Sequence, residues 1–249
     1  QPGGGTVQDA LQDALRQFAI TPIKVICAGR TDAGVHALGQ VVHFDSDIQR
    51  SEYAWVRGAN TFLSPAVAVR WARFVPTDFH ARASACARHY RYFLVNRAHR
   101  PGLWHQRVSW YHHPLDVAAM RSAAVHLLGE HDFSAFRAAE CQAVTPVKTM
   151  QRADITRQGE LIVFDFEASA FLHHMVRNLV GSLVCIGQGR KPPEWLAELL
   201  QCGDRRQAAA TFPADGLYLV EVKYPAHWRL PTCEKIADGP LPPVSTFAE

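Results

Sequence analysis

Residues Ser84 to Asn96 have the sequence SACARHYRYFLVN, and this stretch decides the fold class of the 249-residue chain. Its side chains alternate with a period of two, which is typical of a β-strand. We expect Arg88, Tyr90 and Tyr92 on one face of this strand and His89, Arg91 and Phe93 on the other. The sequence therefore predicts one long strand, and the neighbouring segments can be interpreted around it.

Shorter strands and several helices are expected on both sides of this strand. The strands are predicted at 23–27, 40–44 and 67–75, in a hairpin at 147–157 and 160–168, and at 217–224. The helices are predicted at 7–18 behind an N-cap at Thr6, and at 51–63, 115–128, 171–187 and 193–202, whereas 130–146 is expected to be a loop. Runs of strands are interrupted by single helices, without regular βαβ alternation. This order favours an α+β fold with a largely antiparallel sheet and flanking helices.

The composition indicates a folded, soluble, cytoplasmic protein. The chain is 48% hydrophobic and 20% charged, and no apolar run approaches the roughly 20 residues that span a bilayer. The N-terminal residues QPGGGTVQDA do not have the pattern of a signal peptide. We therefore expect no membrane association.

Arginine dominates the positive charge, with 21 Arg against 5 Lys. Eight of these arginines fall between Arg70 and Arg107, where Asp78 is the single acidic residue. A guanidinium binds a phosphate through two parallel hydrogen bonds, so this cluster suits a polyanion such as RNA. The alternative is that arginine replaces lysine through genomic composition alone.

No metal site is expected. The six cysteines are spread along the chain without a C-x-x-C pair, and most are expected to be small buried residues. The pairs His112-His113 and His173-His174 are weak candidates, because adjacent residues point in different directions on a helix or strand.

A glycine-bearing loop, Gly29-Arg30-Thr31-Asp32-Ala33-Gly34-Val35-His36, is the sharpest chemical feature. Its glycines allow positive φ angles and the close approach of a ligand. The loop can present the Asp32 carboxylate to a ligand while Arg30 binds a phosphate of that ligand. The alternative is an ordinary turn in which Asp32 caps the next segment.

The helix expected at 171–187 carries Arg177 and, one turn later, Gly181. Gly181 has no side chain, so another element can approach there and Arg177 can lie along the interface. A buried arginine needs a carboxylate partner, and Asp32 is the one we favour. The alternative is a solvated arginine on a helix surface.

The run Arg88-His89-Tyr90-Arg91-Tyr92 offers a second mode of RNA binding. A tyrosine between arginines can stack on a base while the arginines hold flanking phosphates. The alternative is that these tyrosines only pack the sheet.

Together these pieces resemble the TruA family of bacterial tRNA pseudouridine synthases. The similarity rests on five motifs in the family's order: GRTDAGVHALGQVVHF, DFHARASACARHYRYFLVN, HDFSAFRAAECQAVTP, FLHHMVRNLVGSLVCIG and TFPADGLYLV. It covers the chain to about Tyr224. The resemblance implies an isomerase that converts uridine to pseudouridine at positions 38, 39 and 40 of the tRNA anticodon arm.

The same resemblance implies roles for individual residues. Asp32 is the expected catalytic aspartate, Arg177 its ion-pair partner, Arg30 an aid to base flipping, Tyr90 the residue that stacks on uracil, and Leu217 part of the pocket lining. Tyr90 is also an expected catalytic residue, placed to help remove the C5 proton as a base or through water. Further tRNA contacts are expected at Phe79, His80, Ala81, Arg82 and Ala83, and at Glu140, Cys141, Gln142, Ala143 and Val144. The enzyme is expected to be a homodimer without cofactor or metal.

The resemblance also implies a pseudouridine synthase fold of two α/β halves. They are expected at 1–100, with the aspartate loop, and at 101–224, with the arginine helix, followed by a Pro-rich tail at 225–249. Family members have an opening strand and a Tyr-Asp-Gly loop ahead of the stretch that matches Pro2 to Gln8. A sheet without that strand is expected to expose ladder edges and apolar surface.

Two alternatives to the enzyme stay open from the residues. One is an RNA-binding protein on the same scaffold without catalysis. The other is an unrelated nuclease or hydrolase that uses Asp32 with His36 or His43, although no metal cluster or nucleophile–base pair is evident in the sequence.

Overall fold

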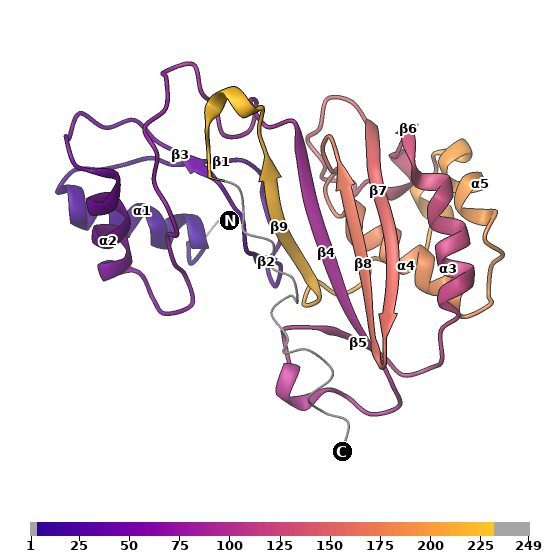
Figure 1. The fold of residues 1–249 in the computed structure, drawn as a ribbon. Coiled ribbons are helices and arrows are strands. Elements are labelled where there is room, and N and C mark those ends of the chain that lie inside the picture. The colour runs from indigo at the N-terminus through magenta and orange to yellow at the C-terminus, as the bar shows by residue number, and fades with distance from the viewer. Residues whose placement is uncertain (1–3, 232–249) are drawn as a thin grey trace. The chain divides into compact units, whose positions relative to one another are not determined.

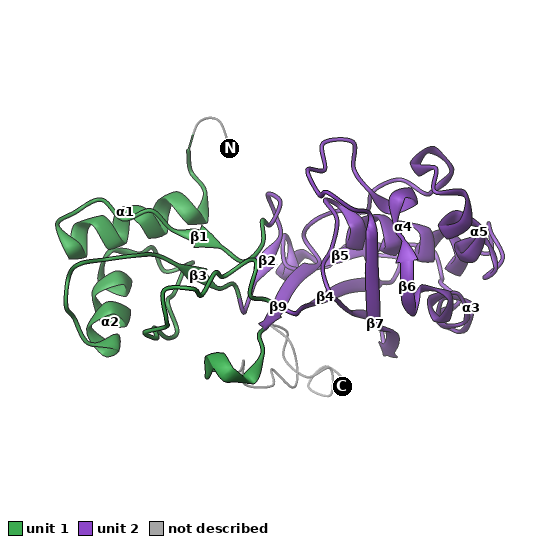
Figure 2. Cartoon of the chain, turned by 90° about the horizontal axis from the view of Figure 1, so that it is seen from above, with its two compact units in different colours: residues 1–30, 40–85, 224–232 green, residues 31–39, 86–223, 233–249 purple. Residues whose placement is uncertain are grey.

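The computed structural model describes residues 4–231, and within it the chain forms two compact units (Figure 2). The described part of unit 1 consists of residues 4–30, 40–85 and 224–231, and that of unit 2 of residues 31–39 and 86–223. The units interleave along the chain, so they do not correspond to the halves 1–100 and 101–224 predicted from the sequence. Of the predicted tail, residues 232–249 lie outside the described residues.

Unit 1 pairs two helices with a small sheet (Figure 1). Its elements are α1 (Val7–Ala19), α2 (Glu52–Phe62), the antiparallel strands β1 (Ile26–Cys27) and β3 (Val42–His43), and a short 3-10 turn at Ala226–Trp228. Thr6 caps α1 through a capping box with Asp9, as predicted, and Ser51 caps α2. The helices pack together over a core of Leu15, Ile23, Val25, Trp55 and Ala59.

The strand predicted at 67–75 is wrong. This segment runs without a ladder, because Val69 exchanges both of its backbone hydrogen bonds with the side-chain amide of Asn60 on α2, at 2.7 and 2.8 Å. A side chain that satisfies the backbone in this way removes the need for a neighbouring strand. The strands predicted at 23–27 and 40–44 exist but shorten to the two residues each of β1 and β3.

Unit 2 is built on a seven-stranded sheet with β4, the long strand predicted from the sequence, near its centre (Figure 1). The strands are β2 (His36–Ala37), β4 (Ala87–Asn96), β5 (Ser109–Tyr111), β6 (Gly129–Asp132), β7 (Val147–Gln158), β8 (Leu161–Ala168) and β9 (Leu217–Lys223). Their order is β2-β9-β4-β8-β7-β6, with β5 beside β4. The β2–β9 and β4–β5 pairs are parallel and the others antiparallel, which confirms the α+β, largely antiparallel prediction.

Three helices of unit 2 gather near the β6–β8 end of this sheet (Figure 1). They are α3 (Val117–Ala124), α4 (Met175–Gly187) and α5 (Trp195–Cys202). Helix α3 packs against both α4 and β7. The largest fully buried side chains include Tyr92, Phe164 and Phe166 of the sheet and Met175 and Leu179 of α4. Hydrophobic burial between α4 and the sheet therefore supports the segment that carries Arg177.

The two faces of β4 differ as the period of two predicts. On one face, His89 and Arg91 both reach the Asp165 carboxylate of β8, at 2.6 and 2.7 Å. On the other, the Tyr92 ring packs edge-on against Phe164, with centroids 6.1 Å apart. The face of His89 and Arg91 therefore carries a charge network in its first half, and Phe93 and Val95 farther along the same face join a hydrophobic cluster with Val108, Leu161, Tyr218 and Val220.

Two further predictions are corrected. The 130–146 segment is not only loop, because β6 pairs with β7 and Ser134–Phe136 forms a 3-10 turn. None of the five described cysteines is buried: Cys86 and Cys202 are exposed and the others are half-buried.

No helix among residues 4–231 has both the length and the apolar character to cross a membrane.

Candidate active site

The Asp32 loop is held to the sheet of unit 2 by the strand that follows it. Strand β2 pairs in parallel with β9, His36 opposite Tyr218, only four residues after Asp32. The loop turns at Gly34, whose φ of 84° lies in the left-handed region that glycine adopts without strain. The Asp32 carbonyl accepts a hydrogen bond from Val35 N at 3.1 Å. This turn leaves the Asp32 side chain 22% exposed, at the surface of a rigid sheet.

Helix α4 brings Arg177 to this carboxylate. Arg177 Nη1 donates to Asp32 Oδ2 at 2.8 Å, and its Nε donates to the Phe212 carbonyl at 2.8 Å. The Arg177 side chain is only 16% exposed, so the pair lies in a partly desolvated position where a charge-assisted hydrogen bond is strong. The predicted ion pair is confirmed.

Gly181 has the role that its position predicts. A Cβ built on Gly181 would collide with the Ala210 carbonyl. The segment that contains Ala210 also supplies Phe212, whose N–H donates to the Arg177 carbonyl at 3.2 Å and whose carbonyl accepts from the Arg177 side chain. The close approach at Gly181 therefore helps to orient Arg177.

The adjacent histidines His173 and His174 both face Asp32. Their Nε2 atoms lie 3.2 Å from Asp32 Oδ1 and 3.2 Å from Asp32 Oδ2, respectively. The prediction that neighbouring residues point apart is wrong here, because α4 begins at Met175 and not at Phe171. His174 has a φ of 61°, and this left-handed turn brings its ring to within 4.0 Å of the His173 ring, centroid to centroid. For this reason His173 and His174 are only a weak candidate from the sequence.

Burial lowers the pKa of His174, against the opposing influence of the nearby Asp32 carboxylate; His173 and Arg177 also lower it. The imidazole of His174 is therefore biased toward its neutral form. Both oxygens of Asp32 have nitrogen neighbours, which restrains the carboxylate in one orientation.

Tyr90 and Leu217 lie on adjacent strands of the same unit. Tyr90 is buried on β4, with its ring edge-on to Phe171 at 5.0 Å between centroids. Burial raises the pKa of Tyr90 to about 12, Arg88 opposes this, and the charge of Asp32 adds to it. Leu217 begins β9, is 5% exposed and pairs with Tyr92 in register. Both side chains are therefore buried against the sheet and expose little surface to solvent.

The predicted tRNA-contacting residues divide between the units. In unit 2, Cys141 of the 140–144 segment adjoins the site, because the His173 N–H donates to Cys141 Sγ at 3.3 Å. Arg137 braces this segment through the Cys141 and Ala143 carbonyls, at 2.8 and 3.0 Å. Glu140, Gln142 and Val144 are exposed.

In unit 1, only part of the predicted 79–83 segment is available to a ligand. Phe79 and Ala81 are buried, and Phe79 packs on Trp228 with centroids 5.0 Å apart. Arg82 and Ala83 are exposed, and His80 is half-buried. Arg30 is exposed and also belongs to unit 1.

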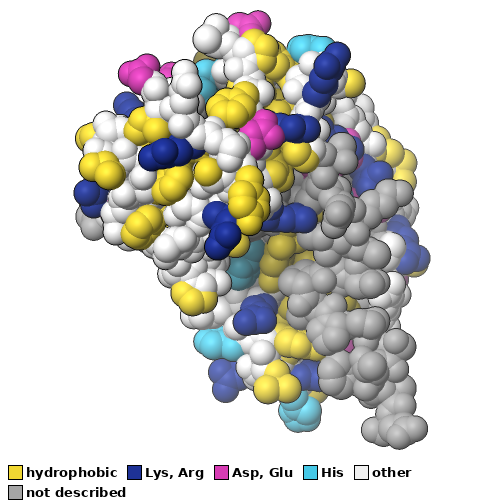
Figure 3. Space-filling view, turned by 60° about the vertical axis from the view of Figure 1, so that its left-hand side comes forward, with side chains coloured by type: hydrophobic (Ala, Val, Ile, Leu, Met, Phe, Trp, Pro, Cys, Tyr) yellow, Lys and Arg dark blue, Asp and Glu magenta, His cyan; other side chains and the backbone are white. Residues whose placement is uncertain are grey.

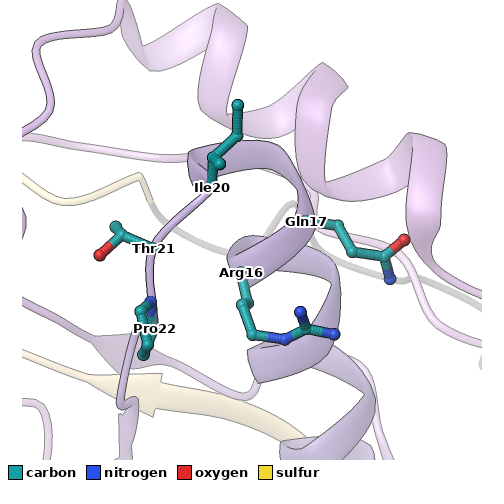
Figure 4. Close-up of a pocket in the computed structure, with 5 residues that line it drawn as sticks. All are labelled: Arg16, Gln17, Ile20, Thr21 and Pro22. Atoms are coloured by element: carbon teal, nitrogen blue, oxygen red, sulfur yellow. The ribbon is translucent and has the colours of Figure 1, made fainter.

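Unit 1 also has an open hollow where α1 ends (Figure 4). Its lining consists of Arg16, Gln17, Ile20, Thr21 and Pro22. This set contains no carboxylate, histidine or cysteine, so it has no general base that could activate the Thr21 hydroxyl. Among the described residues, the site around Asp32 brings together a carboxylate, two imidazoles and a guanidinium.

Comparison with known proteins shows the family of the chain. A family model described as "tRNA pseudouridine synthase" matches residues 1–82 and 123–225. The protein named "tRNA pseudouridine synthase A" from Dechloromonas aromatica is 61% identical over 231 residues, which cover 93% of this chain and 88% of the relative. Its namesakes from Methylibium petroleiphilum and Burkholderia multivorans are 56% and 54% identical, over 93% and 100% of this chain and 89% and 91% of their own lengths. The chain therefore belongs to the tRNA pseudouridine synthase family.

Proposed function

We propose that this protein isomerises uridine to pseudouridine in tRNA, at positions 38, 39 and 40 of the anticodon arm. The single observation that carries the proposal is the Asp32 carboxylate held by Arg177 at 2.8 Å, on a glycine turn at the edge of the sheet. Family membership and the names of the relatives support the substrate, and the three positions rest on the motif resemblance. A cytoplasmic location fits a tRNA substrate.

The reaction breaks the N1–C1′ bond of uridine, rotates the uracil and forms a C5–C1′ bond. The reacting atoms are inaccessible in a stacked helix, so the nucleotide has to be extruded into a pocket. Arg30 is our candidate for the residue that assists this step, through the phosphate beside the extruded nucleotide.

Asp32 is the proposed catalytic carboxylate. In one route Asp32 attacks C1′ while the N1–C1′ bond breaks, and C5 of the turned uracil then attacks C1′ and displaces the carboxylate. In the other, a glycal route, Asp32 takes a proton from C2′ as the N1–C1′ bond breaks and returns it when C5 bonds to C1′. In both routes N1 gains one proton. Arg177 holds the carboxylate in one orientation in both routes, through the hydrogen bond from its Nη1 to Asp32 Oδ2. Loss of the C5 proton completes the isomerisation. No electron is exchanged, so the chemistry itself requires no redox cofactor.

Tyr90 is proposed to stack on the target uracil. Its hydroxyl, with a pKa of about 12 caused mainly by burial, stays protonated at neutral pH. A neutral phenol is a hydrogen-bond donor and not a base, which favours stacking over direct removal of the C5 proton by Tyr90. Leu217 is proposed to line the same pocket.

The rest of the tRNA is proposed to bind through the exposed parts of 79–83 and 140–144 and through arginines of unit 1. Figure 3 displays Lys and Arg side chains interspersed with hydrophobic ones over the visible surface. Arg57 lies over the ring of Tyr53, 5.7 Å from its centroid, and Phe74 is 69% exposed. Arginines next to accessible aromatic rings suit phosphates and bases together. From the family resemblance we also propose a homodimer.

The alternative is a protein that binds RNA without modifying it. Such a protein has no need for a partly buried Asp32–Arg177 pair, whose desolvation costs free energy. The pair therefore favours the enzyme.

Tritium release from tRNA labelled at uridine C5 tests the proposal. We expect release by the unaltered chain and none by Asp32→Ala, while tRNA affinity stays within a few fold because phosphate contacts dominate it. Asp154→Asn, at an exposed carboxylate of β7, is the matched control and should release tritium normally. Turnover by Asp32→Ala would refute the assignment of Asp32, and the absence of release from the unaltered chain, with tRNA still bound, would favour the RNA-binding alternative.

A further inference from the structure

Asp32, His173 and His174 bring three potential metal ligands together at one point of unit 2. One ligand atom from each lies within 4.8 Å of those of the other two. Two imidazole nitrogens and a carboxylate oxygen form the ligand set that borderline divalent cations such as Zn²⁺ prefer, whereas Mg²⁺ prefers oxygen atoms.

The spacing of these atoms fits a small coordination sphere. Zinc binds nitrogen and oxygen at about 2.0–2.2 Å, so neighbouring ligands of a tetrahedral ion lie about 3.3–3.5 Å apart. His173 Nε2 lies 3.2 Å from Oδ1 and His174 Nε2 lies 3.2 Å from Oδ2. One ligand atom from each of the three residues lies within 4.8 Å of the other two, so side-chain movements of about 1–2 Å would bring them to this spacing.

The ligands are also accessible. The side chains of Asp32, His173 and His174 are 22%, 39% and 27% exposed, so an ion can reach them from solvent.

Arg177 limits how strongly this site can bind a cation. Its guanidinium donates to Asp32 Oδ2 at 2.8 Å, whereas Oδ1 lies 3.2 Å from His173 Nε2. A cation bound through Oδ1 and the two imidazoles would share the carboxylate with a positive charge. This arrangement argues for reversible binding rather than for a permanent metal centre.

We propose that Asp32, His173 and His174 form a reversible binding site for a borderline divalent cation of the Zn²⁺ class, and that its occupation inhibits the enzyme. Coordination takes the lone pairs of the three ligands and releases any proton that the imidazoles carry. The carboxylate is then bound to the ion and no longer free to act on the ribose. The binding claim is independent of the proposed function, and the inhibition claim rests on it.

Two measurements on the whole 249-residue chain, after treatment with a chelator, test this site. Co²⁺, a spectroscopic substitute for Zn²⁺, should produce visible absorption bands of a nitrogen- and oxygen-bound ion, and calorimetry should detect Zn²⁺ binding. Tritium release from labelled tRNA should fall as Zn²⁺ rises over the same concentrations, recover with a chelator and not respond to an equal concentration of Mg²⁺.

His173→Gln and His174→Gln, tested singly, are each expected to weaken Co²⁺ and Zn²⁺ binding at least about 10-fold, because each removes one ligand. The matched control is the other adjacent histidine pair, His112 and His113, whose ring centroids lie 3.9 Å apart. Within the described residues, neither of these histidines forms an ion pair with a carboxylate. The double variant His112→Gln/His113→Gln should bind the ions and release tritium as the unaltered chain does. Circular dichroism of each variant verifies that it is folded.

The outcomes separate the claims. Absence of Co²⁺ bands, or bands that disappear only in the His112/His113 variant, would overturn the site. Binding at Asp32 without any loss of tritium release would overturn the inhibition. A metal-free chain that releases no tritium would contradict the proposed function, while the cobalt spectrum would still decide the site.

Discussion

Arg177 Nη1 lies 2.8 Å from Asp32 Oδ2, although the two residues are 145 positions apart in the sequence. The contact joins a loop held by β2 to the first turn of α4. A partly buried carboxylate with one guanidinium and two imidazoles around it is the chemical centre of the described structure.

Replacing Arg177 by methionine should separate this pair with little change in side-chain length. Asp32 would lose its strongest electrostatic partner, and we expect kcat for tritium release to fall about 100-fold or more, in the range typical for loss of one preorganised electrostatic group. We expect tRNA affinity to change far less. Arg190→Met, at an exposed arginine beyond the other end of α4, is the control. Equal losses in both variants would show that the charge acts through general tRNA binding.

Gly181→Ala tests whether the close approach of the Ala210 carbonyl to Gly181 supports stability and the position of Arg177. The new Cβ has to displace the Ala210 carbonyl, and such overpacking costs about 1–3 kcal/mol of folding free energy. The displaced segment also carries the acceptor for Arg177 Nε, so kcat should fall together with the free energy of unfolding. Urea denaturation and tritium release measure the two effects.

Gly102→Ala is the matched control, because a Cβ at Gly102 meets nothing within 4 Å. It should leave both quantities unchanged. A Gly181→Ala protein as stable and active as the parent would mean that the 210–212 segment moves aside without consequence.

Asp165 should make the stability of unit 2 sensitive to acid. Despite the opposing effect of burial, hydrogen bonds from His89 and Arg91 hold the pKa of Asp165 down, at about 2. A carboxyl whose pKa is lower in the folded state stabilises it at a pH above its unfolded value of about 3.9, and this contribution disappears as the pH falls toward 2. Allowing for solvent screening, we expect about 1–2 kcal/mol.

Urea denaturation between pH 6 and pH 2 checks this expectation. Asp165→Asn should be less stable than the parent at pH 6, and the difference should shrink as the pH approaches 2. Asp154→Asn removes a carboxylate that is 70% exposed and 3.8 Å from Arg152, and should show no such dependence. A constant difference for Asp165→Asn over the whole range would contradict the linkage to protonation.

Tyr90 should not contribute a limb to the pH–rate profile below about pH 9. Burial, the larger cause, raises the pKa of Tyr90 to about 12, so its hydroxyl carries a proton throughout this range. Tyr90→Phe keeps the ring and should therefore bind tRNA like the parent, with a kcat profile of the same shape. Tyr90→Ala removes the stacking surface and should lower kcat/KM about 10- to 100-fold, the equivalent of 1–3 kcal/mol of stacking. A limb near neutral pH that vanishes in Tyr90→Phe would assign proton transfer to Tyr90.

Local patterns in the sequence were sufficient for most elements. Helix α1 follows from the N-cap at Thr6 and the long strand β4 from its period of two. Helix α2 and the β7–β8 hairpin also form where the sequence predicted them. The strand predicted at 67–75 failed because Asn60, on another element, takes its backbone hydrogen bonds. The short strands β2, β5 and β6 were missed because each depends on a partner strand and has little pattern of its own.

The sequence by itself determined the family, the candidate aspartate and its arginine partner, because those features are written in residue types and their spacing. Only the tertiary structure decided that His173 and His174 turn together toward Asp32. That arrangement depends on α4 starting at Met175 after a left-handed residue, and on a carboxylate brought there from a loop more than 140 positions away. Tertiary packing sets the positive φ angle of His174 and the long-range contacts to Asp32, and the local sequence specifies neither of them.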